Sequence, residues 1–191
     1  RDRSPSRGLG DVYKRQLDDG ALEAAAEYAR TNKIQLSVHA MGDRAVGRII
    51  DFFEHQTPWL EDRPSVRIEH ATFLNEAQLA RMNASAMRFG VTTQVIFPYA
   101  EIEGYRAVLA PKDLERVYPV RTVSSALDAF ALSSDAPATA WADPDDPFVS
   151  MGAAVTRTAW DGTVFNRSEA VSCEEAVSLY TSRPMTVLPF E

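Results

Sequence analysis

The chain has 191 residues, a formal net charge of −7 at pH 7 and one cysteine. This length allows one domain with a sizeable core, but it is short of the roughly 250 residues of a complete eight-stranded α/β barrel. The acidic balance argues against nucleic acid as a partner, and no apolar run approaches the about 18 residues of a transmembrane span. Because Cys173 has no possible disulfide partner within the chain, we expect a reducing, cytoplasmic location.

The first 16 residues differ from the rest of the chain. They contain five Lys or Arg and two Asp, and they show neither helical nor strand periodicity. The run 4–16 resembles a translated cloning or adapter sequence that recurs in front of unrelated environmental reading frames. We therefore expect residues 1–16 to be a non-native leader and residues 17–191 to form the domain. The alternative is a genuine basic arm.

Strand and helix patterns alternate through the remaining chain, which is typical of a parallel sheet with crossover helices. Short apolar or β-branched runs predict strands, and a period near 3.6 predicts helices. The predicted strands cover residues 34–39, 66–70, 91–96 and 129–134. The predicted helices cover residues 17–32, a stretch opened by Asp43, a stretch from Asn75 to about Phe89, residues 112–116, 119–127 and 148–158, and a last stretch opened by Ser172.

Several helix ends carry recognisable signals. Asn75 and Gln78 have the spacing of a capping box, and Gly90 is expected to stop that helix in the left-handed conformation. Asp43 is in position to cap the amides of its helix. The long connection 97–119 is expected to be functional or to contain helix of its own.

Three predicted strands end at or just before a residue that can bind a metal or move a proton, namely His39, His70 and Asp135. Carboxyl ends of parallel strands collect on one face, and that face carries the chemistry in barrels and wound sheets. Imidazole and carboxylate are ligands that zinc accepts. Taken singly, each histidine is better explained as structural, but their joint placement favours a metal site. His55 is interpreted as exposed and inert.

Side-chain alternation supports this site only in part. His39 shares its face with Ser37, whereas His70 has the parity of the apolar Val66 and Ile68. Either His70 lies just past its strand, or a bulge changes the register there. Other chemistries lack their minimal parts, since the chain has no Gly-x-Ser-x-Gly turn and no glycine-rich loop after a strand.

Five motifs resemble, in order, the carboxyl half of amidohydrolase family 3. They are VHAMGDRAV at 38–46, RIEHA at 67–71, SSDAP at 133–137, AAVTR at 153–157 and SCEEAVSLYT at 172–181. The resemblance covers about residues 17–190. It implies an α/β fold corresponding to the C-terminal half, strands five to eight, of a TIM-type (β/α)8 barrel, so that residues 17–191 form a partial barrel domain.

The resemblance also implies a function. The family consists of metal-dependent hydrolases of non-peptide carbon–nitrogen bonds, so a small amide-type molecule is the expected substrate. The family's strand-five and strand-six histidines, matched by His39 and His70, bind a divalent metal, for which we expect zinc, as one or two ions in the intact parent. The strand-eight aspartate, matched by Asp135, is both a metal ligand and the proton carrier.

The chain also departs from the family pattern. It lacks the His-x-His pair of the first barrel strand and the strand-four ligand, and Val95 follows Gln94 where many relatives have proline. We therefore expect a truncated reading frame whose open barrel edges promote self-association. One alternative is an inactive half-barrel that binds metal weakly or serves as an interaction scaffold. Another is a phosphoester or lactone hydrolase on the same barrel. The substrate-binding residues stay open.

Overall fold

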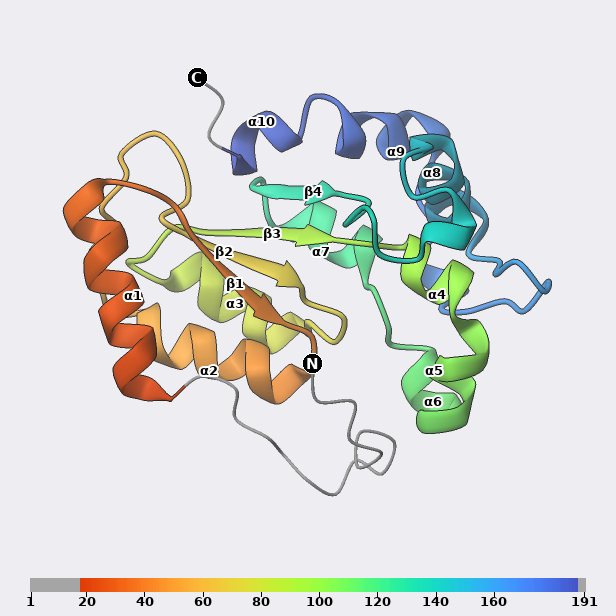
Figure 1. Cartoon of the computed structure of the whole chain (residues 1–191), viewed down its shortest axis with the longest axis horizontal. Coiled ribbons are helices and arrows are strands. Elements are labelled where there is room, and N and C mark those ends of the chain that lie inside the picture. The colour runs from red at the N-terminus through yellow and green to blue at the C-terminus, as the bar shows by residue number, and fades with distance from the viewer. Residues whose placement is uncertain (1–17, 189–191) are drawn as a thin grey trace.

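The computed structural model describes residues 18–188 (Figure 1), so the expected leader at 1–16 lies outside the described residues. Within that range, four parallel strands form one sheet in chain order. They are β1 Leu36–Ala40, β2 Val66–His70, β3 Phe89–Thr93 and β4 Phe130–Leu132. The predicted α/β fold with a four-stranded parallel sheet is therefore confirmed.

Helices connect the strands and continue after the last one. They are α1 Asp19–Asn32, α2 Asp43–Phe53, α3 Glu76–Ala84, α4 Ile96–Ala100, α5 Ile102–Val108, α6 Pro111–Leu114, α7 Val120–Ala126, α8 Pro147–Thr156, α9 Cys173–Tyr180 and α10 Pro184–Val187. Two short 3-10 helices are η2 Ala140–Ala142 and η3 Arg167–Glu169. Figure 1 shows α2, α3 and α7 along one face of the sheet and α8 to α10 beyond β4. None of the described helices combines the length and apolarity needed to cross a bilayer.

The helix-covered face of the sheet is apolar because alternate strand residues point into it. Val66, Ile68 and Val91 are buried there in the same cluster as Ile50 and Phe53 of α2. Burying side chains of this size contributes about 1.5–3 kcal/mol each. This face therefore supplies much of the driving force that holds the sheet and its helices together.

The opposite face is polar. Arg67 and Glu69 of β2 lie on it beside Ser37 of β1 and Thr92 of β3, as the pairing Ser37 to Arg67 and Glu69 to Thr92 requires. Ser37 is exposed, whereas Thr92 is buried. The sheet thus separates an apolar face under helices from a polar face that includes His39.

The predicted end of α3 and the predicted span of β3 are wrong in detail. The helix ends at Ala84, because the Ser85 hydroxyl accepts from the Met87 amide (2.9 Å) and donates to the Glu54 carbonyl (2.8 Å). This turn lets β3 start at Phe89. Gly90 is therefore a strand residue and not a helix stop, and a side chain there would lie 3.0 Å from Pro64.

The other end signals are largely confirmed. Asn75 and Gln78 form the capping box, and the Ser172 hydroxyl accepts from the Glu175 amide at 3.1 Å. Asp43 is not the cap of α2 but its first residue, where its carboxylate accepts from the Arg44 amide at 2.8 Å. The connection 97–119 does contain helix of its own, α5 and α6 together with most of α4.

Candidate metal centre

The two histidines lie at the carboxyl ends of neighbouring strands. His39 is the penultimate residue of β1 and pairs with Glu69, whereas His70 is the last residue of β2 and pairs with Ala40. Regular alternation would therefore direct the His70 side chain to the face opposite that of His39.

A left-handed backbone brings the two rings together. His70 has φ of 72° and Ala71 has φ of 46°, both uncommon for residues with a side chain. The ring of His70 then meets that of His39 with 4.3 Å between centroids and 66° between planes. The expectation that His70 lies past the strand or next to a bulge is wrong. It is a paired strand residue, and its own φ sets the direction of its side chain.

His70 is buried and held in one orientation. Its Nδ1 lies 2.8 Å from Oε1 of Gln94, whose Nε2 donates to the Ser133 hydroxyl at 2.7 Å. Since an amide oxygen only accepts, Nδ1 of His70 is the donor in this bond, and Nε2 is the nitrogen that a metal would use. The ring also stacks on Phe97, with centroids 5.8 Å apart. An imidazole fixed through its second nitrogen in this way is typical of metal-binding histidines.

His39 is more open to solvent but favours the neutral form. Partial burial of the ring is the largest cause that lowers the pKa of His39 below 6.5, and repulsion from His70 adds to it. The nearby charges of Asp135 and Glu69 raise that pKa but do not outweigh the other two causes. A neutral imidazole is the form that binds a metal.

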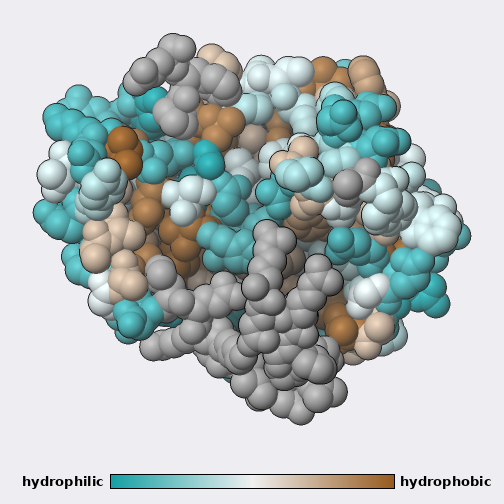
Figure 2. Space-filling model, viewed as in Figure 1, coloured by the Kyte–Doolittle hydropathy of each residue, from teal (hydrophilic) through white to brown (hydrophobic). Residues whose placement is uncertain are grey.

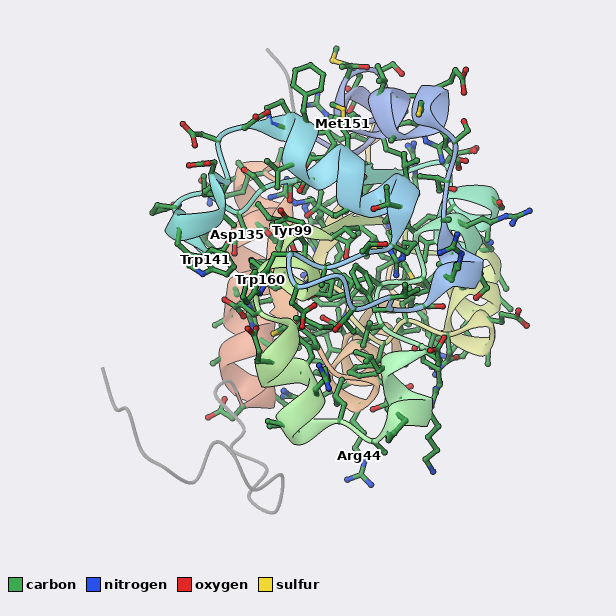
Figure 3. All side chains as sticks on the ribbon, turned by 90° about the vertical axis from the view of Figure 1, so that its right-hand side faces the viewer. Arg44, Tyr99, Asp135, Trp141, Met151 and Trp160 are labelled. Atoms are coloured by element: carbon green, nitrogen blue, oxygen red, sulfur yellow. The ribbon has the colours of Figure 1, made fainter. Side chains whose placement is uncertain are left out.

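Asp135 lies in the turn that follows β4. It is exposed, has φ of 54°, and its carbonyl accepts from the Ala138 amide at 2.9 Å. Figure 3 labels it on the same side of the molecule as Tyr99, Trp141 and Trp160. Its charge reaches His39, but within residues 18–188 no three His, Cys, Asp or Glu side chains are arranged as a metal-binding group. The structure thus places the two histidine rings in contact, whereas Asp135 is connected to them only through the effect of its charge on His39.

A polar network lies beside His39 and was not anticipated from the sequence. The Glu69 carboxylate accepts from the Ser37 hydroxyl (2.7 Å), from Nε of Arg67 (2.5 Å) and from the Thr92 hydroxyl. Arg67 also donates to the Gln35 amide oxygen at 3.0 Å. The Glu69 carboxylate is therefore engaged in hydrogen bonds within the sheet. The available signal was the run of polar residues at alternate positions of β2 and β3.

The donor set fits a divalent ion of the zinc type. Two imidazoles in contact, one of them held through Nδ1, are ligands that such ions accept. His55, the third histidine, has a side chain that is 91% exposed and lies 3.6 Å from Glu54. It lies outside this site, as expected.

Comparisons with known proteins give the family of the chain. The family model described as "Amidohydrolase family" matches residues 4–191. The chain is 27% identical over 167 residues to the "Putative amidohydrolase YtcJ" of Bacillus subtilis (strain 168), covering 86% of this chain and 30% of that protein. It is 26% identical over 151 residues to the N-substituted formamide deformylase of Arthrobacter pascens, covering 79% and 27%.

Two solved structures have the same fold. One is an uncharacterized metal-dependent hydrolase from Pyrococcus furiosus, with a TM-score of 0.71, 28% identity and coverage of 90% of this chain and 32% of that one. The other is an uncharacterized metal-dependent hydrolase from Pyrococcus horikoshii OT3, with a TM-score of 0.74, 24% identity and coverage of 90% and 33%. The chain thus spans about a third or less of the length of each of these relatives.

Proposed function

Because the chain belongs to the amidohydrolase family, we propose that it is the carboxyl half of a hydrolase barrel that cleaves non-peptide carbon–nitrogen bonds with a divalent metal. Four parallel strands in chain order, apolar on the helix-covered face and polar on the other, support half of a TIM-type barrel. In this proposal residues 17–191 are the partial barrel domain, residues 1–16 a leader, and the cytoplasm the site of action.

His39 and His70 are the proposed metal ligands. The observation that carries the proposal is their ring contact at the carboxyl ends of β1 and β2, with Nδ1 of His70 held by Gln94. A divalent ion bound there, zinc in our proposal and one or two ions in the intact parent, would polarise the scissile carbonyl and make a water more acidic. The two imidazoles would hold the ion, because Gln94 fixes the orientation of His70 through Nδ1 and burial disfavours protonation of His39.

Asp135 is proposed as an additional ligand and as the proton carrier. An amide nitrogen leaves poorly as an anion, so a group at the site must take a proton from the attacking water and return it to that nitrogen. Asp135 is exposed, and it is close enough to His39 for its charge to raise the pKa of that imidazole. Its Oδ atoms hold the proton between the two steps.

The relative that deformylates N-substituted formamides suggests the first substrates to test. The experiment measures zinc binding and amine release from N-benzylformamide by the longer protein that contains this sequence. We expect His39→Ala and His70→Ala to lose zinc and turnover, and the matched His55→Ala to keep both. Zinc affinity and turnover unchanged in the two site variants would contradict the proposal.

The alternative is an inactive half-barrel that acts as a weak metal-binding or interaction scaffold. The lack of a ready three-residue ligand group among the described residues favours it. Zinc binding by the longer protein without hydrolysis of any amide, lactone or phosphoester would establish this alternative. Hydrolysis of lactones or phosphoesters, but not amides, would instead change the bond assigned to the site.

A further inference from the structure

A cavity of about 300 Å³ lies between the ends of β1 and β2 and helix α5. Met41 and Phe73 form one wall, and Tyr105, Val108 and Leu109 form the other. Figure 2 shows hydrophobic surface in the region of α5, where Val108 is 61% exposed. A volume at the lower end of the usual range for ligand sites suits one ring or a short branched chain.

Two residues that line the cavity follow the two histidines closely in the chain. Met41 follows His39 by two residues, and Phe73 follows His70 by three. The Phe73 amide donates to the Met41 carbonyl at 3.2 Å, so the two segments that leave the histidines stay together at the cavity wall. A molecule reacting beside the two imidazoles therefore has an apolar cavity next to the segments that follow both histidines.

The lining determines which groups the cavity accepts. Its walls are mostly apolar, and the Tyr105 hydroxyl is already bonded to that of Tyr118 at 2.7 Å. Among residues 18–188, one acidic residue, Glu101, lines the cavity, and no basic residue does. Partial burial raises the pKa of the Glu101 carboxyl, as expected for a carboxylate withdrawn from water. Such a lining attracts apolar, neutral or cationic groups and repels anionic ones.

We propose that this cavity holds an apolar substituent of the substrate, neutral or cationic but not anionic, while the scissile bond lies beside His39 and His70. The assignment of that occupant rests on the proposed hydrolase function. The cavity itself is tested by binding, without turnover.

Gly104 offers a way to fill the cavity without disturbing the fold. It lines the cavity from α5, and a Cβ added there would meet nothing within 4 Å. Gly152 of α8 is also helical and equally free of contacts, but it does not line the cavity, so Gly152→Leu is the matched control. Both substitutions replace a helical glycine with a better helix former.

The experiment measures binding of N-benzylformamide to the metal-free chain by NMR titration. We expect Gly104→Leu to weaken binding by about tenfold or more, as a blocked apolar pocket does, and Gly152→Leu to leave it unchanged. Absence of binding to the wild type, or equal binding by both variants, would overturn the proposal.

Glu101 provides an independent arm that tests the charge preference. The probe is 4-(formamidomethyl)benzoate, the carboxylate analogue of the same ligand. We expect it to bind the wild type at least about tenfold more weakly than N-benzylformamide, and Glu101→Gln to recover most of that loss. Glu103→Gln, in the first turn of α5, which Glu101 precedes, but outside the lining, is the control. Recovery in the control variant, or none in Glu101→Gln, would refute the charge preference.

The two proposals fail differently. Binding that depends on Gly104, without hydrolysis by the longer protein, removes the hydrolase function and keeps the cavity as a binding site. In the opposite case, the longer protein hydrolyses N-benzylformamide, but Gly104→Leu does not change the binding constant. That result keeps the hydrolase function and removes the cavity assignment.

Discussion

The rings of His39 and His70 meet at 4.3 Å although the alternation of β1 and β2 assigns them to opposite faces of the sheet. The left-handed φ of His70, 72°, reorients the second ring. A non-glycine residue in this region costs of order 1–3 kcal/mol and persists only when surrounding contacts enforce it. Here the Thr93 hydroxyl donates to the His70 carbonyl at 2.6 Å, and the Ala71 amide donates to the Ala40 carbonyl at 3.0 Å.

Gln94 is predicted to be a positioning residue for the metal. Gln94→Ala removes the acceptor that keeps the proton of His70 on Nδ1, so we expect zinc affinity to fall about 10–100-fold. Gln56→Ala, at a partly buried glutamine that follows α2 and donates to the Phe52 carbonyl, is expected to change nothing at the site. Isothermal titration of both variants with zinc decides the matter. Equal affinity for the two would show that Gln94 only fills space.

The sequence predicted what depends on local patterns. The strand at 66–70 follows from the period of its apolar side chains. The capping box at Asn75 follows from the need of the first helix amides for acceptors, which residues close in sequence supply. The end of α3 was wrong because Ser85 turns the chain through contacts with Glu54, a residue 31 positions away. Helical period continues past that point in the sequence, so a local pattern could not reveal the turn.

The site was predictable in its residues but not in its geometry. The histidines at the ends of two adjacent strands were visible in the sequence. The φ of His70 instead depends on hydrogen bonds with other strands, one from Thr93 of β3 and one from the Ala71 amide to Ala40 of β1. The partner of His70 was visible only as a polar residue, Gln94, in a run of β-branched residues. Its role became apparent once β3 was seen to end at Thr93 and Gln94 to face the ring.

The protonation of His39 is predicted to respond to both of its neighbours. Its pKa is below 6.5 in the folded chain, so the unfolded chain takes up this proton first as the pH falls. The stability linked to His39 is therefore complete above about pH 6.5 and is lost as the pH falls towards the folded pKa. Asp135→Asn removes an attraction and should lower the pKa of His39 further, whereas His70→Ala should raise it. NMR titration of the imidazole measures this, and a rise in Asp135→Asn would place that carboxylate away from the site.

Asp135 and Asp43 are predicted to have different roles. In the longer protein, Asp135→Asn should lower turnover by about 10²–10⁴-fold with zinc still bound, because the amide cannot carry the proton. Asp43→Asn should keep turnover and lower stability by about 0.3–1 kcal/mol, because a negative charge in the first turn of α2 is lost. Steady-state kinetics and denaturant unfolding of both variants separate the roles. Turnover at the wild-type rate in the zinc-loaded Asp135 variant would rule out the proton-carrier assignment.

The described chain is predicted to associate with itself. β1 and β4 are the two edges of the sheet, and Ser37 is exposed on the polar face of edge strand β1. Unpaired strand edges are sites for pairing with another copy. Sedimentation of the chain at micromolar concentrations should therefore give species larger than a monomer. Ser37→Lys should reduce their share, whereas Ser125→Lys on the exposed surface of α7 should not. A monomer at all concentrations with one sharp thermal transition would contradict the open-barrel interpretation.

Arg157 is predicted to be a structural anchor whose loss weakens the whole fold. It is fully buried, and its guanidinium donates to the carbonyls of Val117 and Tyr118 (both 3.0 Å) and Asn166 (3.2 Å) while lying 4.7 Å over the Phe165 ring. Burial lowers its pKa to about 10, because the charge is costly away from water. The three hydrogen bonds offset part of that cost.

Arg157→Met removes three buried hydrogen bonds and should lower the free energy of unfolding by about 2–4 kcal/mol. Each carbonyl keeps one other donor, namely Nδ2 of Asn166 for Val117 and the amides of Val120 and Glu169 for Tyr118 and Asn166. Arg157→Lys should not restore stability, because a single ammonium cannot reach carbonyls that a planar fork bridges. Arg167→Met, at an exposed arginine in η3, is the matched control and should stay within about 0.5 kcal/mol of the wild type. Urea unfolding followed by circular dichroism measures all three variants. A midpoint for Arg157→Met equal to that of the control would mean that the second donor of each carbonyl suffices, and that the buried charge contributes nothing net to the fold.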